Sequence, residues 1–235
     1  KWTTLVALVI GGGIYFLLSP YFNIKNITTT GNEKITSEEI ISLSGIQLNE
    51  NMFKISGNKI EQAIKTNAYI DSVNLKRKLP DSIELQVVER KPAYMLTIGN
   101  AYGYISSQGY ILEISKDSLE LPIITGFATP KDQVQAGNRL CAEDLEKLNS
   151  VIQIIDSANS NEIGKLITKV NIEDKQDYVL ELEEENKTVH LGDTSNLSTK
   201  MLYIKTVLEN EKDKEGEIFV NTDLNTNGAI FREKV

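Results

Sequence analysis

The sequence predicts an α+β protein: an apolar N-terminal helix, then a small domain of strands and helices, then a larger strand-rich domain with two helices. Hydrophobic side chains recur with a period of two in some segments and about 3.6 in others, which indicates strands and helices. Residues 19–91 hold 10 Lys and Arg against 9 Asp and Glu, whereas residues 92–235 hold 14 against 24. Such a charge shift at a proline predicts a domain boundary. The expected parts are residues 1–19, 20–91 and 92–235.

Residues 2–18 are expected to form a transmembrane anchor. They are 17 residues without a charge, and about 17–25 apolar residues are needed to cross the hydrocarbon core of a bilayer. Trp2 lies at one end and Tyr15 and Tyr21 lie near the other, as is typical of side chains at the two membrane interfaces. Lys1 favours an N-terminus on the cytoplasmic side, so the rest of the chain would lie outside the cytoplasm.

Two features of the apolar segment have alternative interpretations. A cleaved signal peptide would need small residues before the cleavage position, and residues 17–20 do not fit that requirement. We therefore expect the anchor to be retained. The three glycines at 11–13 either allow another membrane helix to approach closely or are simply tolerated in a membrane helix.

The small domain is expected to run strand, helix, helix, strand, strand. Thr36 and Gly45 mark the two ends of the first helix, because a hydroxyl caps a helix N-terminus and glycine often follows the last turn. Pro80 and Asp81 are typical of a hairpin turn between the last two strands. The elements in order are a strand over 24–32, helices over 36–45 and 56–67, and strands over 69–78 and 82–90.

The larger domain is expected to be mostly strands. Glycine-containing turns separate its first three strands, which predicts a meander. Its first helix carries an apolar stripe that includes Leu145, Leu148 and Ile152. The elements in order are strands over 93–98, 101–107 and 109–114, a helix over 142–158, strands over 166–173, 178–185 and 188–192, a helix over 195–212, and short strands over 216–222 and 228–233.

The strand at 82–90 loses its alternation just before the predicted boundary. Ile83, Leu85 and Val87 alternate with polar residues, and Glu89 then falls where the next inward residue belongs. An unpaired buried carboxylate would be costly, so we expect either a bulge near Val88 or a partner for Glu89 at the rim.

The residues that follow predict a stiff inter-domain joint. Pro92 cannot donate a ladder hydrogen bond, and it biases the residue before it toward an extended conformation. Glu89, Arg90 and Pro92 are therefore the expected joint residues, and they would set the angle between the two domains.

The sequence contains no combination of residues or motifs that is typical of a catalytic site. His190 is the only histidine and is interpreted as a surface or half-buried strand residue, while Cys141 precedes a helix without a redox motif. Residues 181–187 are rich in Glu but lack the pattern of a calcium loop, so we expect a solvated hairpin tip. We therefore expect no enzyme activity, no cofactor and no metal. The net charge of −8 argues against nucleic-acid binding.

Several segments occur in an order that is typical of one protein family. After the apolar segment come YFNIKNITTTGNEKITSEEI, NMFKI and LPDSIELQVVERKPA, followed by YISSQGYIL, LPIITG and VHLGDTSNLSTKMLYIKTVL. The series resembles the bacterial cell-division proteins FtsQ and DivIB, with a POTRA domain first and a β-domain second. The end, VNTDLNTNGAIFREKV, departs from the Asp-Leu-Arg-Tyr that is common in Gram-negative members.

The resemblance implies a single-pass type II protein of the bacterial cytoplasmic membrane that acts at the division septum. Its extracytoplasmic part would bind FtsL and FtsB (called DivIC in Gram-positive bacteria), and also other divisome or septal peptidoglycan-synthesis proteins. The POTRA domain would either dock such proteins or serve as a spacer above the membrane.

In the family the partner-binding surface lies near the last strands. An exposed edge strand there would take up a partner segment by β-augmentation. The alternative is a terminal strand whose apolar residues simply face the core. The residues implied on this sequence are Phe219, Val220, Gly228, Ala229, Ile230 and Phe231.

Two other classes of function fit parts of the pattern. A protein-translocation or assembly factor also carries POTRA domains, but ahead of a barrel of long lipid-facing strands, and two amphipathic helices and an acidic surface do not suit one. A membrane-anchored extracytoplasmic hydrolase built on carboxylates is the other alternative. We favour a non-enzymatic divisome scaffold that supports septum assembly.

Overall fold

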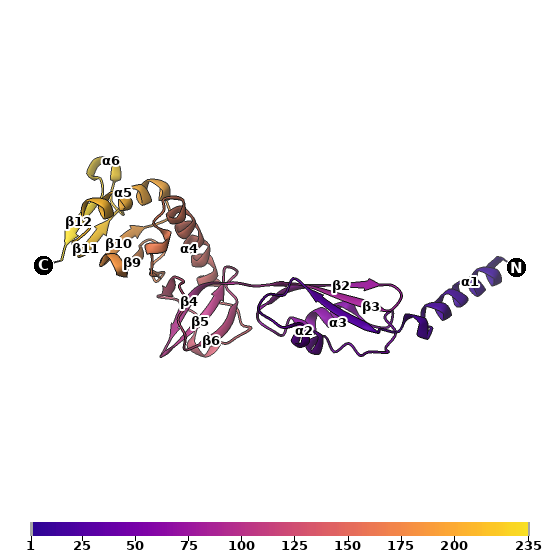
Figure 1. Cartoon of the computed structure of the whole chain (residues 1–235). Helices are drawn as coiled ribbons and strands as arrows, with labels where there is room; N and C mark the ends of the chain where they lie inside the picture. The colour runs from indigo at the N-terminus through magenta and orange to yellow at the C-terminus, as the bar shows by residue number, and fades with distance from the viewer. Residues whose placement is uncertain (1, 235) are drawn as a thin grey trace. The chain divides into compact units, whose positions relative to one another are not determined.

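The computed structural model describes residues 2–234, apart from the side chain of residue 225, and it has the predicted α+β composition (Figure 1). The chain divides into two compact units, Lys1–Arg90 and Lys91–Val235. One sheet has three strands and the other has nine. The main hydrophobic core of the larger unit draws its buried residues from the chain between Tyr94 and Val220.

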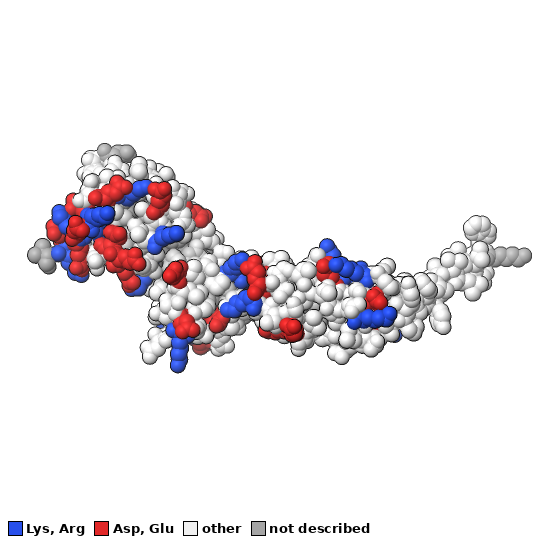
Figure 2. Space-filling view, in the orientation of Figure 1, with Lys and Arg blue, Asp and Glu red and all other residues white. Residues whose placement is uncertain are grey.

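The first unit begins with the apolar helix α1 (Trp2–Leu17), all of whose residues are exposed. Figure 2 shows that α1 carries no Lys, Arg, Asp or Glu. A short 3-10 turn, η1 (Pro20–Phe22), follows, and Phe22 in it is buried. Within residues 2–234, no helix has the combination of length and hydropathy that a membrane crossing requires.

The rest of the first unit has the predicted order of strand, helix, helix, strand, strand. The three-stranded sheet has the order β1-β3-β2, with β1 parallel and β2 antiparallel to β3. Helix α2 contacts β1, α3 contacts β2, and the two helices contact each other. The elements are β1 (Asn26–Thr30), α2 (Ser37–Ser44), α3 (Gly57–Ile64), β2 (Ile70–Lys78) and β3 (Ser82–Glu89).

Local chemistry explains the ends of α2. The side chain of Thr36 accepts a hydrogen bond from the N–H of Glu39 at 3.2 Å, which satisfies one of the free donors at a helix N-terminus. Gly45 ends the helix with φ 66°, a left-handed conformation that glycine adopts without a steric penalty. Both ends were predicted from the sequence, because caps depend on residues close in the chain.

The larger unit contains a nine-stranded sheet and two long helices. The sheet order is β12-β11-β10-β9-β8-β7-β4-β5-β6. The strands are β4 (Pro92–Ile98), β5 (Ala101–Ser106), β6 (Ile111–Ser115), β7 (Ile123–Thr125), β8 (Lys169–Asn171), β9 (Tyr178–Leu182), β10 (Lys187–Gly192), β11 (Gly216–Phe219) and β12 (Ile230–Glu233). The α-helices are α4 (Ala142–Ser160), α5 (Leu197–Asn210) and α6 (Leu224–Asn227), and short 3-10 turns are η2 (Lys131–Gln133), η3 (Gly164–Leu166) and η4 (Glu183–Glu185).

The strand pairing combines hairpins with crossover connections. The meander β4, β5 and β6 is antiparallel, as predicted. β7 joins it to the rest of the sheet, because it pairs in parallel with β4 on one side and β8 on the other. β10 and β11 are parallel and are connected through α5, as parallel neighbours require a crossover. Helices α4 and α5 contact each other and contribute side chains to the core.

Two elements were not predicted from the sequence. β7 has three residues and α6 has four, so neither is long enough to show a hydrophobic period. The strand expected over 166–173 is shorter than predicted: η3 ends at Leu166, and only β8 (Lys169–Asn171) pairs as a strand.

Candidate functional site

β12 forms one edge of the nine-stranded sheet. It pairs with β11 on one side, and no other strand among the described residues pairs with it on the other. Figure 1 shows β12 at the outer end of this sheet, next to the C-terminus. An edge strand of this kind presents main-chain N–H and C=O groups to an incoming segment.

The register identifies which main-chain groups face outward. The N–H of Lys234 donates to the carbonyl of Glu215 at 2.9 Å. Because pairing alternates along an antiparallel ladder, the main-chain groups of Ile230 and Arg232 also face β11. The main-chain groups of Phe231 and Glu233 therefore point away from the sheet and are available to a partner strand.

Side chains of β12 alternate between two environments. Phe231 lies opposite Ile218, which is fully buried, and packs against the core. β12 also explains Gly216, because a Cβ at that position would lie 2.3 Å from the carbonyl oxygen of Arg232 and 2.8 Å from the Phe231 ring. Ile230 faces the other way and is 44% exposed. The inward side chain anchors the strand, and the outward side chain remains available for contact.

Three residues form a row across the outer face of the last three strands. His190 of β10 lies opposite Phe219 of β11, and Phe219 lies opposite Ile230 of β12. The His190 and Phe219 rings stack with their centroids 4.6 Å apart and their planes 2° from parallel. We call His190, Phe219 and Ile230 the outer row.

Charged side chains flank the outer row. The guanidinium of Arg232 lies 4.8 Å from the centre of the Phe219 ring and 3.4 Å from the carboxylate of Glu217. Lys234 and Glu215 form a further pair at 3.0 Å. Figure 2 shows Lys, Arg, Asp and Glu side chains close together at this end of the larger unit. A rim of charges around an apolar row is the usual composition of a protein-binding surface.

The structure places the six partner-binding residues implied by the resemblance in different environments. Phe219 and Ile230 belong to the outer row, and Phe231 and Ala229 are partly buried against the core. Gly228, with φ 62°, follows α6. Val220 lies just beyond β11 and is fully buried, so its side chain is not presented at the surface. His190, interpreted from the sequence as an ordinary strand residue, is the member of the row that sequence reasoning missed, because only the register brings it beside Phe219.

A hollow with a volume of about 640 Å³ lies beside β10 and the start of α5. Two of the charged groups that line it bind each other: the Lys200 ammonium donates to the carbonyl oxygen and the carboxylate of Asp193. Hydrogen bonds from the side chain and N–H of Ser195, together with Lys200, lower the pKa of Asp193 to about 2. Among the described residues no three His, Cys, Asp or Glu side chains are placed to hold a metal ion.

Two of the residues predicted as the joint, Glu89 and Arg90, make well-defined contacts in the first unit. The Glu89 carboxylate accepts hydrogen bonds from the N–H groups of Lys34 and Ile35, at 2.8 and 3.0 Å, so it has the expected rim partner. A register shift also lies at this point, because Ile70 pairs with Glu89 and Ser72 pairs with Val88. The extra residue is on β2, opposite the place where the sequence predicted a bulge.

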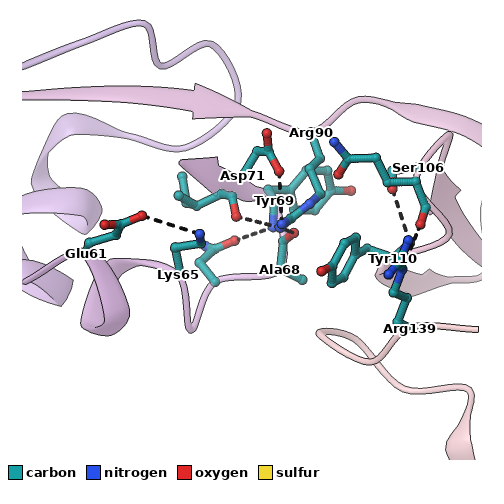
Figure 3. A network of polar contacts seen from close by, with 12 residues as sticks. Glu61, Lys65, Ala68, Tyr69, Asp71, Arg90, Ser106, Tyr110 and Arg139 are labelled. Carbon is teal, nitrogen blue, oxygen red and sulfur yellow. Dashed lines mark hydrogen bonds and ion pairs between the residues drawn. The ribbon is translucent and has the colours of Figure 1, made fainter. Parts of the chain in front are cut away.

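Arg90 holds the end of β3 against β2. Its Nη1 donates to the carbonyls of Ala68 and Ile70, at 3.0 and 2.5 Å, and its Nη2 lies 3.1 Å from the carboxylate of Asp71. Asp71 is the extra residue of the bulge, so the bulge presents a carboxylate to the arginine (Figure 3). In the larger unit, Pro92 is the first residue of β4 and pairs with Ser106.

Family models account for most of the chain. Residues 22–90 match the model described as "POTRA domain, FtsQ-type". Residues 91–223 match the model described as "FtsQ/DivIB, C-terminal related". The chain belongs to the FtsQ/DivIB family. β12 follows the matched residues, so this edge strand lies beyond the part that the FtsQ/DivIB model describes.

Curated FtsQ/DivIB relatives are similar over most of the chain. "Cell division protein DivIB" of Clostridium tetani is 24% identical over 90% of this chain and 80% of its own length. The DivIB protein of Clostridium acetobutylicum is 28% identical over 86% of this chain and 80% of its own length. "Cell division protein FtsQ" of Koribacter versatilis is 25% identical over 84% of this chain and 59% of its own length. The relatives in both groups are cell-division proteins, which supports a divisome role.

Proposed function

We propose that the chain is a non-enzymatic divisome scaffold whose edge strand β12 captures an extended segment of an FtsL- or FtsB/DivIC-type partner. The observation that supports this is the outward direction of the main-chain groups of Phe231 and Glu233 on an edge strand. A partner strand would hydrogen-bond to these groups, while its side chains would meet the outer row. Main-chain bonds would supply affinity, and the row of His190, Phe219 and Ile230 would supply selectivity.

We further propose that the protein lies in the bacterial cytoplasmic membrane at the septum. Helix α1 would be a single-pass anchor with the N-terminus inside, since its side chains are apolar and exposed. Residues 20–91 and 92–235 would then be extracytoplasmic domains, and Glu89, Arg90 and Pro92 would be the joint between them. The contacts of Glu89 and Arg90 support this role, because they hold the last strand of the POTRA domain at the point where the chain leaves it.

A proline at position 233 tests the edge strand directly. Proline removes the outward N–H of Glu233 without removing a bond to β11, so capture of the extracytoplasmic segment of an FtsB/DivIC-type partner by the full chain should be lost. Glu233→Ala is the matched control, because it removes the same side chain and keeps the N–H group. Both variants should retain the circular dichroism of the parent. Unchanged capture by Glu233→Pro would remove the main-chain site.

The outer row has its own test in the same capture measurement. Ile230→Asp puts a charge where a partner side chain would pack, and should weaken capture while the strand itself stays paired. Leu202→Asp, another exposed apolar residue of the larger unit but on α5, should leave capture unchanged. A fluorescent fusion in the parent bacterium tests the divisome role separately: signal at midcell before constriction supports it, and a uniform peripheral signal contradicts it.

A further inference from the structure

We propose that the end of the first unit nearest α1 is a second lipid-contacting surface, which rests in the headgroup layer of the bilayer and works together with the anchor. This surface consists of Tyr21, Leu48, Phe53 and Leu79, and we call it the anchor-side pole. The inference rests on the proposed role of α1 as a membrane anchor. In addition to the anchor, the POTRA domain would itself contact the bilayer surface, and would not be connected to the membrane by a flexible linker alone.

Exposed apolar side chains of the domain gather at this pole. Four large apolar side chains are exposed among residues 23–90: Leu48, Phe53, Leu79 and Val88. The first three belong to the pole, and Leu48 and Leu79 are more than half exposed. Leu48 precedes Asn49, whose N–H donates to the carbonyl of Ile24, in the segment after α1, at 2.8 Å. Single exposed apolar residues are common, but a group of them at one end marks an interaction surface.

Ring contacts connect the pole to α1. Phe22, which is buried, packs edge to face on Phe16 of α1 at 5.2 Å and on Phe53 at 5.2 Å. Tyr21 also contacts both Phe16, at 6.4 Å, and Phe22, at 5.1 Å. Phe53 is therefore about 10 Å at most from a ring of the helix. The headgroup layer on each side of a bilayer is about 5–7 Å thick, so an anchor that ends near Leu17 brings Phe53 into that layer or to within a few ångströms of it.

Asn51 links the end of α1 to the loop that carries Phe53. Its side-chain amide donates to the carbonyls of Leu17 and Ser19, at 3.0 and 3.1 Å, and its oxygen accepts from the N–H of Phe53 at 3.0 Å. The last carbonyls of a helix have no partner within the helix, and an unpaired carbonyl is costly in apolar surroundings. Asn51 is 5% exposed, so a buried protein group satisfies the carbonyl of Leu17, the last residue of α1.

The β2–β3 hairpin brings Leu79 to the same end of the domain. Arg77, two residues earlier, donates to the carbonyls of Met52 and Ile55, at 2.9 and 3.0 Å, on either side of Phe53. In the turn of the hairpin, the carbonyl of Asp81 accepts from the N–H of Lys25 at 2.7 Å. The tip of the hairpin is thus fixed beside the segment that follows α1 and beside the loop that carries Phe53.

The composition of the pole fits a lipid surface better than an acidic or basic partner. Two lysines near it are paired with carboxylates, since Lys25 pairs with Asp81 at 3.2 Å and Lys78 pairs with Glu84 at 3.0 Å. Aromatic and leucine side chains beside a membrane helix are typical of the bilayer interface. Contact should therefore depend on apolar burial and only weakly on the charge of the lipid.

Fluorescence quenching in vesicles tests the proposal with the full chain. A Cys141→Ser variant carries one new cysteine, Lys54→Cys, labelled with an environment-sensitive dye and reconstituted into phosphatidylcholine vesicles that contain a lipid quencher. We expect a blue-shifted, quenched signal at position 54, and no quenching of a label at Val88→Cys, the exposed apolar position outside the pole. Combining Phe53→Ser and Leu79→Ser should abolish quenching at position 54.

The outcomes separate the pole from the anchor. If the protein floats with the vesicles but the label at position 54 is not quenched, the pole proposal is wrong and the anchor stands. Quenching that persists in the double serine variant, or that requires added phosphatidylglycerol, also overturns the pole, because apolar burial would not be its cause. A protein that does not float overturns the anchor and the pole together. Partner capture is measured independently, so the edge-strand proposal is unaffected by any of these results.

Discussion

The carboxylate of Glu89 is bound by the main chain of Ile35: Oε1 of Glu89 accepts a hydrogen bond from the N–H of Ile35 at 3.0 Å. The other carboxylate oxygen accepts from the neighbouring N–H of Lys34 at 2.8 Å. The last residue of β3 thereby holds the loop that leads into α2. A residue that breaks the alternation of its own strand has a structural role in a loop more than fifty positions away.

Replacing Glu89 by alanine should destabilise the first unit by about 1–3 kcal/mol, because two main-chain donors lose their acceptor and Ile35 is buried. The measurement is the free energy of unfolding in urea, followed by circular dichroism. Glu38→Ala is the control, because Glu38 is an exposed carboxylate in the first turn of α2. Its loss should lower the free energy of unfolding by only about 0.3–1 kcal/mol. Equal losses in the two variants would show that the Glu89 contacts do not matter for stability.

Gly31→Ala should destabilise the same unit more than Gly45→Ala. Both glycines have positive φ, 84° and 66°, and a left-handed backbone costs an L-residue about 1–2 kcal/mol. At Gly31 a Cβ would also lie 2.2 Å from the carbonyl oxygen of Val87 in β3, whereas nothing lies within 4 Å of a Cβ at Gly45. The difference between the two unfolding free energies measures the clash alone. If the two variants are equally stable, β1 and β3 do not approach as closely as the structure has them.

The stability of the larger unit should fall at acid pH in a way that depends on Asp144. This fully buried residue of α4 accepts hydrogen bonds from the N–H groups of Ala128 and Thr129, at 2.8 and 2.7 Å, and from the Thr129 hydroxyl. Burial raises the pKa of Asp144, but these hydrogen bonds outweigh it and hold the pKa below 3.8. The stabilisation is therefore complete above pH 3.8 and is lost as the pH falls through the pKa of the folded state.

Asp144→Asn removes this pH dependence. We expect the variant to be less stable by about 1.5–3 kcal/mol at neutral pH, since a charged acceptor is lost. The difference from the parent should shrink as the pH is lowered below 3.8. Urea unfolding over a pH series measures this difference in the free energy of unfolding. The control is Asp117→Asn, because Asp117 is at an exposed position. A difference that stays constant with pH would mean that the folded protein does not hold Asp144 as an anion.

Residue patterns over short stretches of the sequence were sufficient to predict most of the helices and strands. The caps of α2, the hairpin between β2 and β3 and the meander of β4 to β6 were predicted, because each depends on residues that are close in the chain. The three-residue strand β7 was not predicted, although it connects the two parts of the larger sheet. A buried strand of three residues has no visible period, and its pairing partners lie far away in the sequence.

The candidate site also depends partly on local sequence and partly on long-range strand pairing. The sequence placed the residues of interest near the last two strands, and it did not distinguish Val220, which is in the core, from Ile230, which is exposed. A shift of one residue in register moves every side chain of a strand to the other face of its sheet. Which face Ile230 occupies is therefore a property of its pairing with Phe219, and the sequence of β12 alone does not contain it.

The sequence by itself determined the order of strands and helices, the family, and the break in pattern at Glu89, because these follow from periodicity, turn residues and motifs along the chain. Only the tertiary structure decided which groups meet across the chain. It set His190 against Phe219, Glu89 against Ile35, and the amide of Asn51 against the last carbonyl of α1. The physical reason is that strand register and helix-end contacts result from packing between distant segments, which residue spacing does not encode.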